Sequence, residues 1–163
     1  MRTDASYTTG SVIMGFDAVR RLIENDRFAA DAGVKLLDLA EGYAKVSVDI
    51  TPRHHNGVGI AQGGAIFTLA DLAFAAAVNS HGIVTVAINA SITFVKSVSS
   101  GIIYAEAREI STSAKLASCT VHVTDSQGVL LAVFQGLAYR KKELVADMAE
   151  GLESFPLSRQ NPV

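Results

Sequence analysis

The chain has 163 residues, of which 49% are hydrophobic and 18% charged, and it carries a formal net charge of −2. A chain of this length and composition is expected to form one globular domain with a buried core rather than a disordered segment. The small negative charge argues against a protein that binds nucleic acid through its phosphates.

The first part of the chain is predicted to contain a helix followed by two strands. After an irregular start over Met1–Gly10, apolar residues recur at helical intervals in Ser11–Ala30. Val34–Leu39 has the composition of a strand, and Tyr43–Ile50 alternates apolar and polar residues, as a strand with one buried face does. Thr51–Ile60, with a proline and two glycines, is expected to be a loop.

The next segment is predicted to be a buried helix. Ala65–Val78 is apolar except for Thr68 and Asp71. A helix that is apolar on all sides has no face for water, so we expect it to be buried. Asp71 would then be a carboxylate within a buried helix, which is costly unless the group is paired, hydrogen-bonded or neutralised.

Four strands joined by short connections are predicted after this helix. They are Ile83–Val95, Ile102–Ile110, Leu116–Thr124 and Val129–Arg140. Strands joined by short turns pair antiparallel, and one apolar helix against such a sheet gives an α+β fold. A sheet of this kind leaves edge strands exposed, and pairing two edges across a twofold axis would cover them, so we expect a homodimer. Glu143–Val163 is predicted to be an appended helix and tail.

Gly63 and Gly64 fall where the buried helix begins. The first N–H groups of a helix have no partner within the helix, and the dipole is positive there, so this end favours an anion or a developing oxyanion. A glycine would let a substrate carbonyl come close to the backbone. Asp71 lies about 12 Å further along the helix axis, too far to act on the same carbonyl. If both are catalytic, Gly63 of one subunit works with Asp71 of another.

Structural explanations of these residues stay open. Asp71 could be a buried carboxylate satisfied by a hydroxyl or a backbone N–H. Gly63 and Gly64 could serve a tight turn or close packing of the helix against a strand.

Several residues around the helix stand at the spacing of a known family. Asn56, the pair Gly63–Gly64 and the run Leu69–Asp71 are spaced as in the hotdog-fold acyl-CoA thioesterases, which this chain resembles. The runs Ala73–Ala75 and Asn79–Gly82 are most similar to the phenylacetate-pathway branch of that family.

The resemblance covers the chain from about Phe28 to Lys141. It implies a hotdog fold, in which a curved antiparallel sheet wraps one long central helix. We therefore expect residues 1–30 to form an N-terminal segment and helix, 31–142 the hotdog thioesterase domain, and 143–163 a C-terminal extension. Dimers of this family commonly pair, so a homodimer or homotetramer is expected.

The resemblance also implies roles for individual residues. The Gly63 N–H would polarise a thioester carbonyl, Asp71 would activate or orient the attacking water or attack directly, and Asn56 would position the thioester or the water. The family usually has histidine before the two glycines, where this chain has Gln62. Glutamine can hydrogen-bond and hold the loop, but it cannot become a cation near neutral pH. The implied reaction is hydrolysis of an aryl-acetyl or medium-chain acyl-CoA, with no metal or redox cofactor.

Besides Gly64, four residues are candidates for substrate binding. Asn89 and Ser91 share one face of their predicted strand and could line the substrate channel or pair across a subunit interface. Coenzyme A carries phosphates, which need nearby cations. Lys96 and Lys115 lie at strand ends, and a basic run covers 140–142. Ordinary solvated charge is the alternative for each.

The remaining signals are weak. Cys119 lies in an alternating strand pattern and is expected to be a small core residue. None of the four histidines has the spacing of a metal site. The start of the chain lacks a basic segment followed by an apolar run, and no apolar run is long enough to span a bilayer, so we expect a cytoplasmic protein.

Two other functions fit the same pattern. A hotdog hydratase or dehydratase would need a histidine paired with a carboxylate at the site, and the helix region offers no such histidine. A non-catalytic acyl-CoA-binding module stays open because of Gln62. Release of free thiol from a panel of acyl-CoAs would separate the three.

Overall fold

The computed structural model describes residues 8–148, so the start of the chain and most of the predicted C-terminal extension lie outside it. The elements appear in the predicted order, with one additional short helix and a 3-10 turn. They are α1 (Thr8–Glu24), α2 (Arg27–Asp31), β1 (Lys35–Ala40), β2 (Tyr43–Ile50), the 3-10 turn η1 (Pro52–His54), α3 (Gly63–Asn79), β3 (Ile83–Phe94), β4 (Gly101–Thr112), β5 (Leu116–Asp125) and β6 (Leu130–Leu144).

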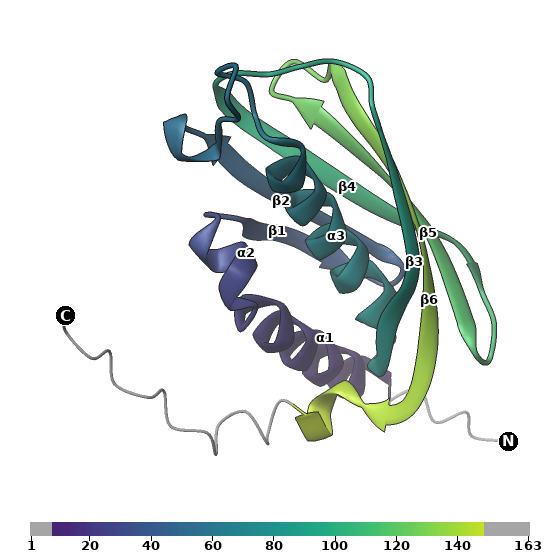
Figure 1. Cartoon of the computed structure of the whole chain (residues 1–163). Coiled ribbons are helices and arrows are strands. Elements are labelled where there is room, and N and C mark those ends of the chain that lie inside the picture. The colour runs from purple at the N-terminus through teal and green to yellow at the C-terminus, as the bar shows by residue number, and fades with distance from the viewer. Residues whose placement is uncertain (1–7, 149–163) are drawn as a thin grey trace, which may run out of the picture.

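The six strands form one antiparallel sheet that bends around α3 (Figure 1). The order across the sheet is β1-β2-β4-β5-β6-β3, so β1 and β3 are the edge strands. One row of cross-strand partners shows the buried face: Val46, Ala105, Val123 and Ala132 are all fully buried. The predicted α+β class is confirmed.

The opposite face of the sheet carries charged side chains. Lys45 and Glu106 are cross-strand partners one residue away from the buried row, and their side chains form a 2.8 Å ion pair. His122 pairs with Glu106 on the next strand and is exposed, as its place in the alternation predicts. Side chains alternate between the two faces of a strand, which explains why the sequence pattern located the sheet so well.

The predicted first helix is in fact two helices. The chain leaves the helix after Glu24, and Asp26 adopts an extended conformation with φ −71° and ψ 98°. Its carboxylate accepts a 2.9 Å hydrogen bond from the Ala29 N–H and so caps α2. An aspartate satisfies helix-start N–H groups better from outside a helix than from within it, which accounts for the break.

The prediction of a helix buried on all sides needs a correction. The side of α3 that faces the sheet is buried, and Leu69, Ala70 and Ala73 are fully inaccessible. A stripe on the other side is only half-buried, however, and it includes Phe67, Asp71 and Ala75. These positions follow the helical repeat, so they form one continuous face of α3. We call this set, with Gly64 and Thr68, the open stripe.

Close packing of α3 on the sheet depends on a glycine in β6. A Cβ at Gly136 would lie 2.6 Å from the ring of Phe74, which is itself buried. Replacing Gly136 by Ala is therefore expected to lower the free energy of unfolding by about 1–3 kcal/mol, the usual cost of overpacking a core. Urea denaturation followed by circular dichroism measures the free energy of unfolding. Gly128→Ala is not a suitable control, because Gly128 has a φ of +80° and any side chain there would strain the backbone.

Ala138, two residues further along β6 and also fully buried, provides the comparison. Ala138→Gly removes a methyl group where Gly136→Ala adds one. An unchanged denaturation midpoint for Gly136→Ala would contradict the close packing of Gly136 against the Phe74 ring.

The ends of the sheet modify the expected boundaries. β6 extends through Leu144, where it pairs with Ile83, so the sheet includes the first two residues of the segment 143–163. Residues 145–148 are helical, and Val145 is buried. At the other end, α1 packs on β1 and α3, so it is part of the same core.

Candidate functional site

At the beginning of α3, the Gly64 N–H donates a hydrogen bond and, within residues 8–148, the Gly63 N–H does not. Gln62 caps the helix from an extended conformation, and its side-chain oxygen accepts the Gly64 N–H. Among the described residues, no acceptor contacts the Gly63 N–H. A Cβ at Gly63 would lie 3.0 Å from the Phe94 ring, so this position has little room for a side chain. The helix end thus presents one free, positively polarised N–H group.

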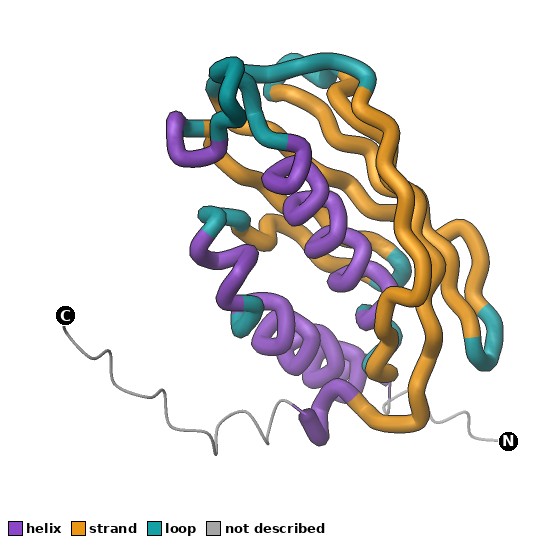
Figure 2. Tube along the Cα trace, viewed as in Figure 1, coloured by secondary structure: helices purple, strands orange, loops and turns teal. Residues whose placement is uncertain are grey.

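Two loops meet at this end of the molecule (Figure 2). The loop before α3 and the loop between β3 and β4 are joined by a 2.8 Å hydrogen bond from the Ala61 N–H to the Val98 carbonyl. His55 adds a second link, because its Nε2–H donates to the Ser99 carbonyl at 2.7 Å. These bonds fix the approach to Gly63.

Asn56 is built into the loop before α3. Its side-chain oxygen accepts hydrogen bonds from the N–H groups of Val58 and Ile60, at 3.0 and 3.3 Å. The carboxamide therefore shapes the loop. Its NH₂ group has no acceptor within the described residues, so it is available to a ligand.

Asp71 lies on the open stripe of α3. Burial raises the pKa of its carboxyl above the ordinary value of 3.8, and the nearby carboxylate of Asp26 raises it further. No hydrogen bond or ion pair to this carboxylate is present within residues 8–148. Residues 8–148 of one protomer therefore offer none of the partners that a purely structural carboxylate would need.

A cavity of about 680 Å³ opens beside the start of α3. Of the site residues assigned from the resemblance, Gln62 and Gly64 line this cavity. The other lining residues come from α2, the 3-10 turn and α3, and from the residues directly after the first two: Phe28, Asp31, Ala32, Arg53, His54, His55, Ala65, Phe67 and Thr68. The sequence signal for Thr68 was its polarity in an apolar helix; its hydroxyl donates to the Gly64 carbonyl at 2.8 Å. Phe94 and Phe28 gave no such signal.

The other predicted substrate residues lie apart from this cavity in one protomer. Asn89 and Ser91 are exposed on β3, the edge strand. Lys96 follows β3 at the end where α3 begins. Lys115 lies at the opposite end of the sheet, where its carbonyl accepts the Arg140 N–H at 2.8 Å. Arg140 pairs with Thr85, so about nine strand positions, or roughly 30 Å, separate the two lysines.

A histidine–carboxylate pair does exist, but at the wrong end of α3 for catalysis at Gly63. His81 Nε2 lies 2.6 Å from a carboxylate oxygen of Glu109. His81 follows the C-terminus of α3, which is about 25 Å from Gly63 along the helix. The pair holds the end of α3 against β4, and this arrangement disfavours the hydratase interpretation.

The structure also bears on Cys119, on metal binding and on membrane-spanning helices. Cys119 is buried, as predicted, and burial raises the pKa of its thiol to about 12. In residues 8–148 no cluster of His, Cys, Asp or Glu is placed to hold a metal ion. No helix in this part of the chain has the length and apolar character required to cross a bilayer.

Comparison with known proteins identifies relatives by sequence. A family model described as the thioesterase superfamily matches residues 58–132. A protein of Archaeoglobus fulgidus that is named as an esterase is 39% identical over 123 residues, which are 75% of this chain and 80% of that protein. The acyl-coenzyme A thioesterase PaaI of Escherichia coli is 30% identical over 120 residues, covering 73% of this chain and 86% of PaaI.

Comparison of structures gives relatives of the same kind. The structure of the E. coli PaaI protein from the phenylacetic acid degradation operon superposes with a TM-score of 0.77 and 27% identity, over 82% of this chain and 97% of PaaI. A mutant of the phenylacetic acid degradation protein PaaI from Thermus thermophilus superposes with a TM-score of 0.68 and 33% identity, over 71% of this chain and 100% of that one.

Proposed function

Because this chain belongs to the thioesterase superfamily, as a hotdog-fold thioester hydrolase of the PaaI type, we propose that it hydrolyses acyl-CoA at the start of α3. The free Gly63 N–H is the observation that carries this proposal. A thioester carbonyl bound there would develop negative charge against the positive end of a 17-residue helix. Asn56 would position the thioester or the attacking water through its free NH₂ group.

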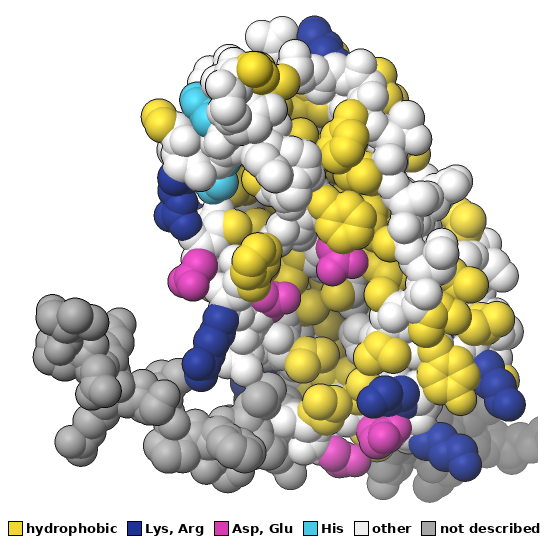
Figure 3. Space-filling model, in the orientation of Figure 1, with side chains coloured by type: hydrophobic (Ala, Val, Ile, Leu, Met, Phe, Trp, Pro, Cys, Tyr) yellow, Lys and Arg dark blue, Asp and Glu magenta, His cyan; other side chains and the backbone are white. Residues whose placement is uncertain are grey.

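The carboxylate for this reaction comes from the neighbouring subunit. Asp71 of the same chain is about 12 Å from Gly63 along α3, which exceeds any contact distance. The open stripe and the free edge of β3 both suit a second copy of the chain. Ile88 and Val86 on β3 are 54% and 39% exposed, and apolar side chains gather between α3 and β3 (Figure 3). A dimer built on β3 would cover this surface and bring the two α3 helices together.

The same dimer would bring Lys96 of one subunit close to Lys115 and the basic run 140–142 of the other. If the two β3 strands pair antiparallel across a twofold axis, the end with Lys96 lies beside the opposite end of the partner's β3. That end carries the partner subunit's Lys115 and its basic run at 140–142. We assign these cations to the phosphates of coenzyme A, and Asn89 and Ser91 to the interface or the adjoining channel.

Steady-state hydrolysis tests the proposed function directly. Release of free coenzyme A, measured with a thiol-detecting reagent, is compared for acetyl-, butyryl-, octanoyl- and phenylacetyl-CoA. We expect aryl-acetyl or medium-chain acyl groups to be hydrolysed with the highest kcat/KM. Absence of thiol release from every acyl-CoA by a folded dimer would reject acyl-CoA hydrolysis as the function of this chain.

Gln62→His is expected to be tolerated. The residue lies at the helix cap, where histidine could also accept the Gly64 N–H through a ring nitrogen. We predict similar or higher turnover and a new pH dependence between roughly pH 6 and 7 if the imidazole touches the thioester. The pH profile of kcat/KM measures this. A large loss of activity would mean that the cap is built for glutamine alone.

We also place the protein in the cytoplasm and expect its dimers to pair into tetramers. Its one cysteine is buried, which suits a compartment without disulfides. Light scattering and cell fractionation test the two statements separately.

A further inference from the structure

The cavity beside α3 is lined by both apolar and charged side chains. Its apolar lining includes Phe28, Phe67 and Ala65, and its charged lining is Asp31 and Arg53. Its volume of about 680 Å³ falls in the range of small-molecule pockets. Gln62 and Gly64 line it as well, so the cavity opens onto the helix end where the thioester is proposed to bind.

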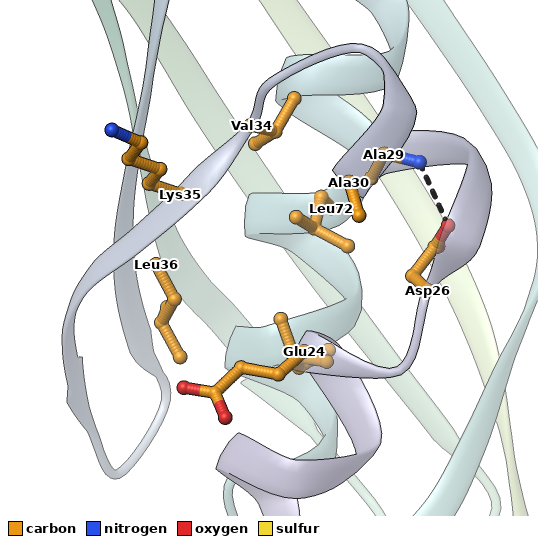
Figure 4. A pocket seen from close by; sticks show the side chains of 9 residues that line it. Glu24, Asp26, Ala29, Ala30, Val34, Lys35, Leu36 and Leu72 are labelled. Atoms are coloured by element: carbon orange, nitrogen blue, oxygen red, sulfur yellow. Dashed lines mark hydrogen bonds between the residues drawn. The ribbon is translucent and has the colours of Figure 1, made fainter.

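Phe28 is the unusual residue of this cavity. Its side chain is 75% exposed, although a phenylalanine ring gains considerably from burial. It lies on α2, whose other side is fixed: Ala29 is buried, and it lines a smaller cavity with Leu72 of α3 (Figure 4). The ring of Phe28 therefore faces the large cavity while the backbone of α2 is packed against α3.

Two hydrogen bonds hold α2 in this position. Asp26 caps the start of the helix through the Ala29 N–H. After its end, the Ala32 carbonyl accepts a 2.8 Å hydrogen bond from the Nε2–H of His54, whose other ring nitrogen accepts the Thr51 N–H at 3.1 Å. Buried His54 thus ties α2 to the loop that leads to Gly63. An exposed ring on an anchored backbone is suited to contact a ligand, because little order is lost on binding.

A second aromatic ring of the cavity is also held in place. Phe67 lies on the open stripe of α3, and its ring meets Phe134 edge-on, with centroids 5.3 Å apart and an interplanar angle of 69°. Phe134 is fully buried in β6. The cavity therefore has one ring supported by the core and one ring left uncovered.

We propose that Phe28 is a specificity-determining residue that contacts the body of the acyl group, with Phe67 as a second aromatic contact in the same cavity. Bulky apolar acyl groups would then be bound in preference to acetyl. This inference rests on the proposed function, because it takes the thioester to lie at Gly63.

Equilibrium binding tests the inference without requiring turnover. Isothermal titration calorimetry is done on the full-length protein with free coenzyme A, S-ethyl-CoA and S-octyl-CoA, the last two being thioethers that cannot be hydrolysed. We expect Phe28→Ala to weaken binding of S-octyl-CoA about tenfold and to leave free coenzyme A within about twofold. Phe28→Leu should show a smaller loss. Hydrolysis of octanoyl-CoA should fall in parallel, and that of acetyl-CoA should not.

Ile110→Ala is the matched control. Ile110 is 66% exposed on β4 and is not among the residues that line the cavity. We expect no change in any of the three affinities. Circular dichroism and light scattering establish that each variant is folded and has the wild-type oligomeric state.

The outcomes separate the two hypotheses. Equal weakening of all three ligands by Phe28→Ala, no weakening at all, or dissociation of the dimer in place of an acyl effect would overturn the role of Phe28. Acyl-dependent binding that is lost in Phe28→Ala, in a protein that hydrolyses no acyl-CoA, would support this role while rejecting the proposed hydrolysis.

Discussion

Replacing Asp71 by Asn is expected to preserve the fold and to lower kcat by about a hundredfold or more. Asparagine has nearly the same shape but can neither accept a proton from water nor attack a thioester. The effect should fall on kcat rather than on the affinity for substrate, because the carboxylate is proposed to act in the chemical step. Asp17→Asn makes the same change in charge on an exposed position of α1 and should leave kcat unchanged.

The pH profile adds an independent measurement to this variant. Burial and the Asp26 carboxylate raise the pKa of Asp71 above 3.8, and a base or nucleophile acts when deprotonated. The kcat/KM of the wild type should therefore fall as the pH drops through a value above that of an ordinary aspartate. A well-folded Asp71→Asn protein with unchanged kcat would contradict the proposed role of Asp71 as base or nucleophile.

The stability of the same variant should change in the opposite direction to its activity. A carboxyl whose pKa is raised by folding binds its proton more tightly in the folded state, so its favourable contribution is present at low pH and is lost as the pH rises through the folded pKa. At neutral pH the ionised Asp71 therefore lowers the free energy of unfolding of the protomer. Asp71→Asn should then be at least as stable as the wild type, which is typical of a residue kept for function.

Most of the fold could be predicted because it depends on local periodicity. The alternation in Tyr43–Ile50 identified a strand with one buried face, and Val46 and Val48 are buried on that face. The break between α1 and α2 was missed, since an Asp within a helical pattern does not reveal whether it continues the helix or caps the next one. Here the 2.9 Å hydrogen bond from the Ala29 N–H to the Asp26 carboxylate shows that Asp26 caps α2.

The open stripe of α3 was missed for a different reason. Phe67 and Ala75 are apolar, so the sequence pattern could not distinguish them from core residues. A helix face that is proposed to pack against a second subunit can be as apolar as a core, and periodicity within one chain does not separate the two. Thr68 and Asp71, the polar side chains of the stripe, were the residues that indicated a different environment.

The candidate site was predictable where chemistry follows from local position. Gly63 at a helix start and Asp71 two turns later needed only the helical repeat. The roles of Gln62 as a cap and Asn56 as a loop-former required the folded loop, and the nearness of Phe94 to Gly63 depends on how β3 pairs with β6. The distance between Lys96 and Lys115 likewise follows from sheet topology, which one sequence does not contain.

Two inactive variants are expected to restore activity to each other. Gly63→Val would crowd the Phe94 ring and block the carbonyl, because even a Cβ there lies 3.0 Å from that ring. Asp71→Asn removes the carboxylate. If each site combines Gly63 of one subunit with Asp71 of its neighbour, a mixed dimer has one site with both defects and one with neither. After subunit exchange of equal amounts, thiol release should rise from near zero to about a quarter of the wild-type rate.

A second mixture reverses the expected direction and excludes a site within one chain. The double variant Gly63→Val/Asp71→Asn is mixed with an equal amount of wild type. A composite site leaves both sites of the mixed dimer broken, so exchange should lower activity from about half to about a quarter of that of undiluted wild type. A site formed within one chain would instead keep one intact site in each mixed dimer, and activity would stay at about half. In that case, with no recovery in the first mixture, Asp71 would act with an oxyanion donor of its own chain or would be structural.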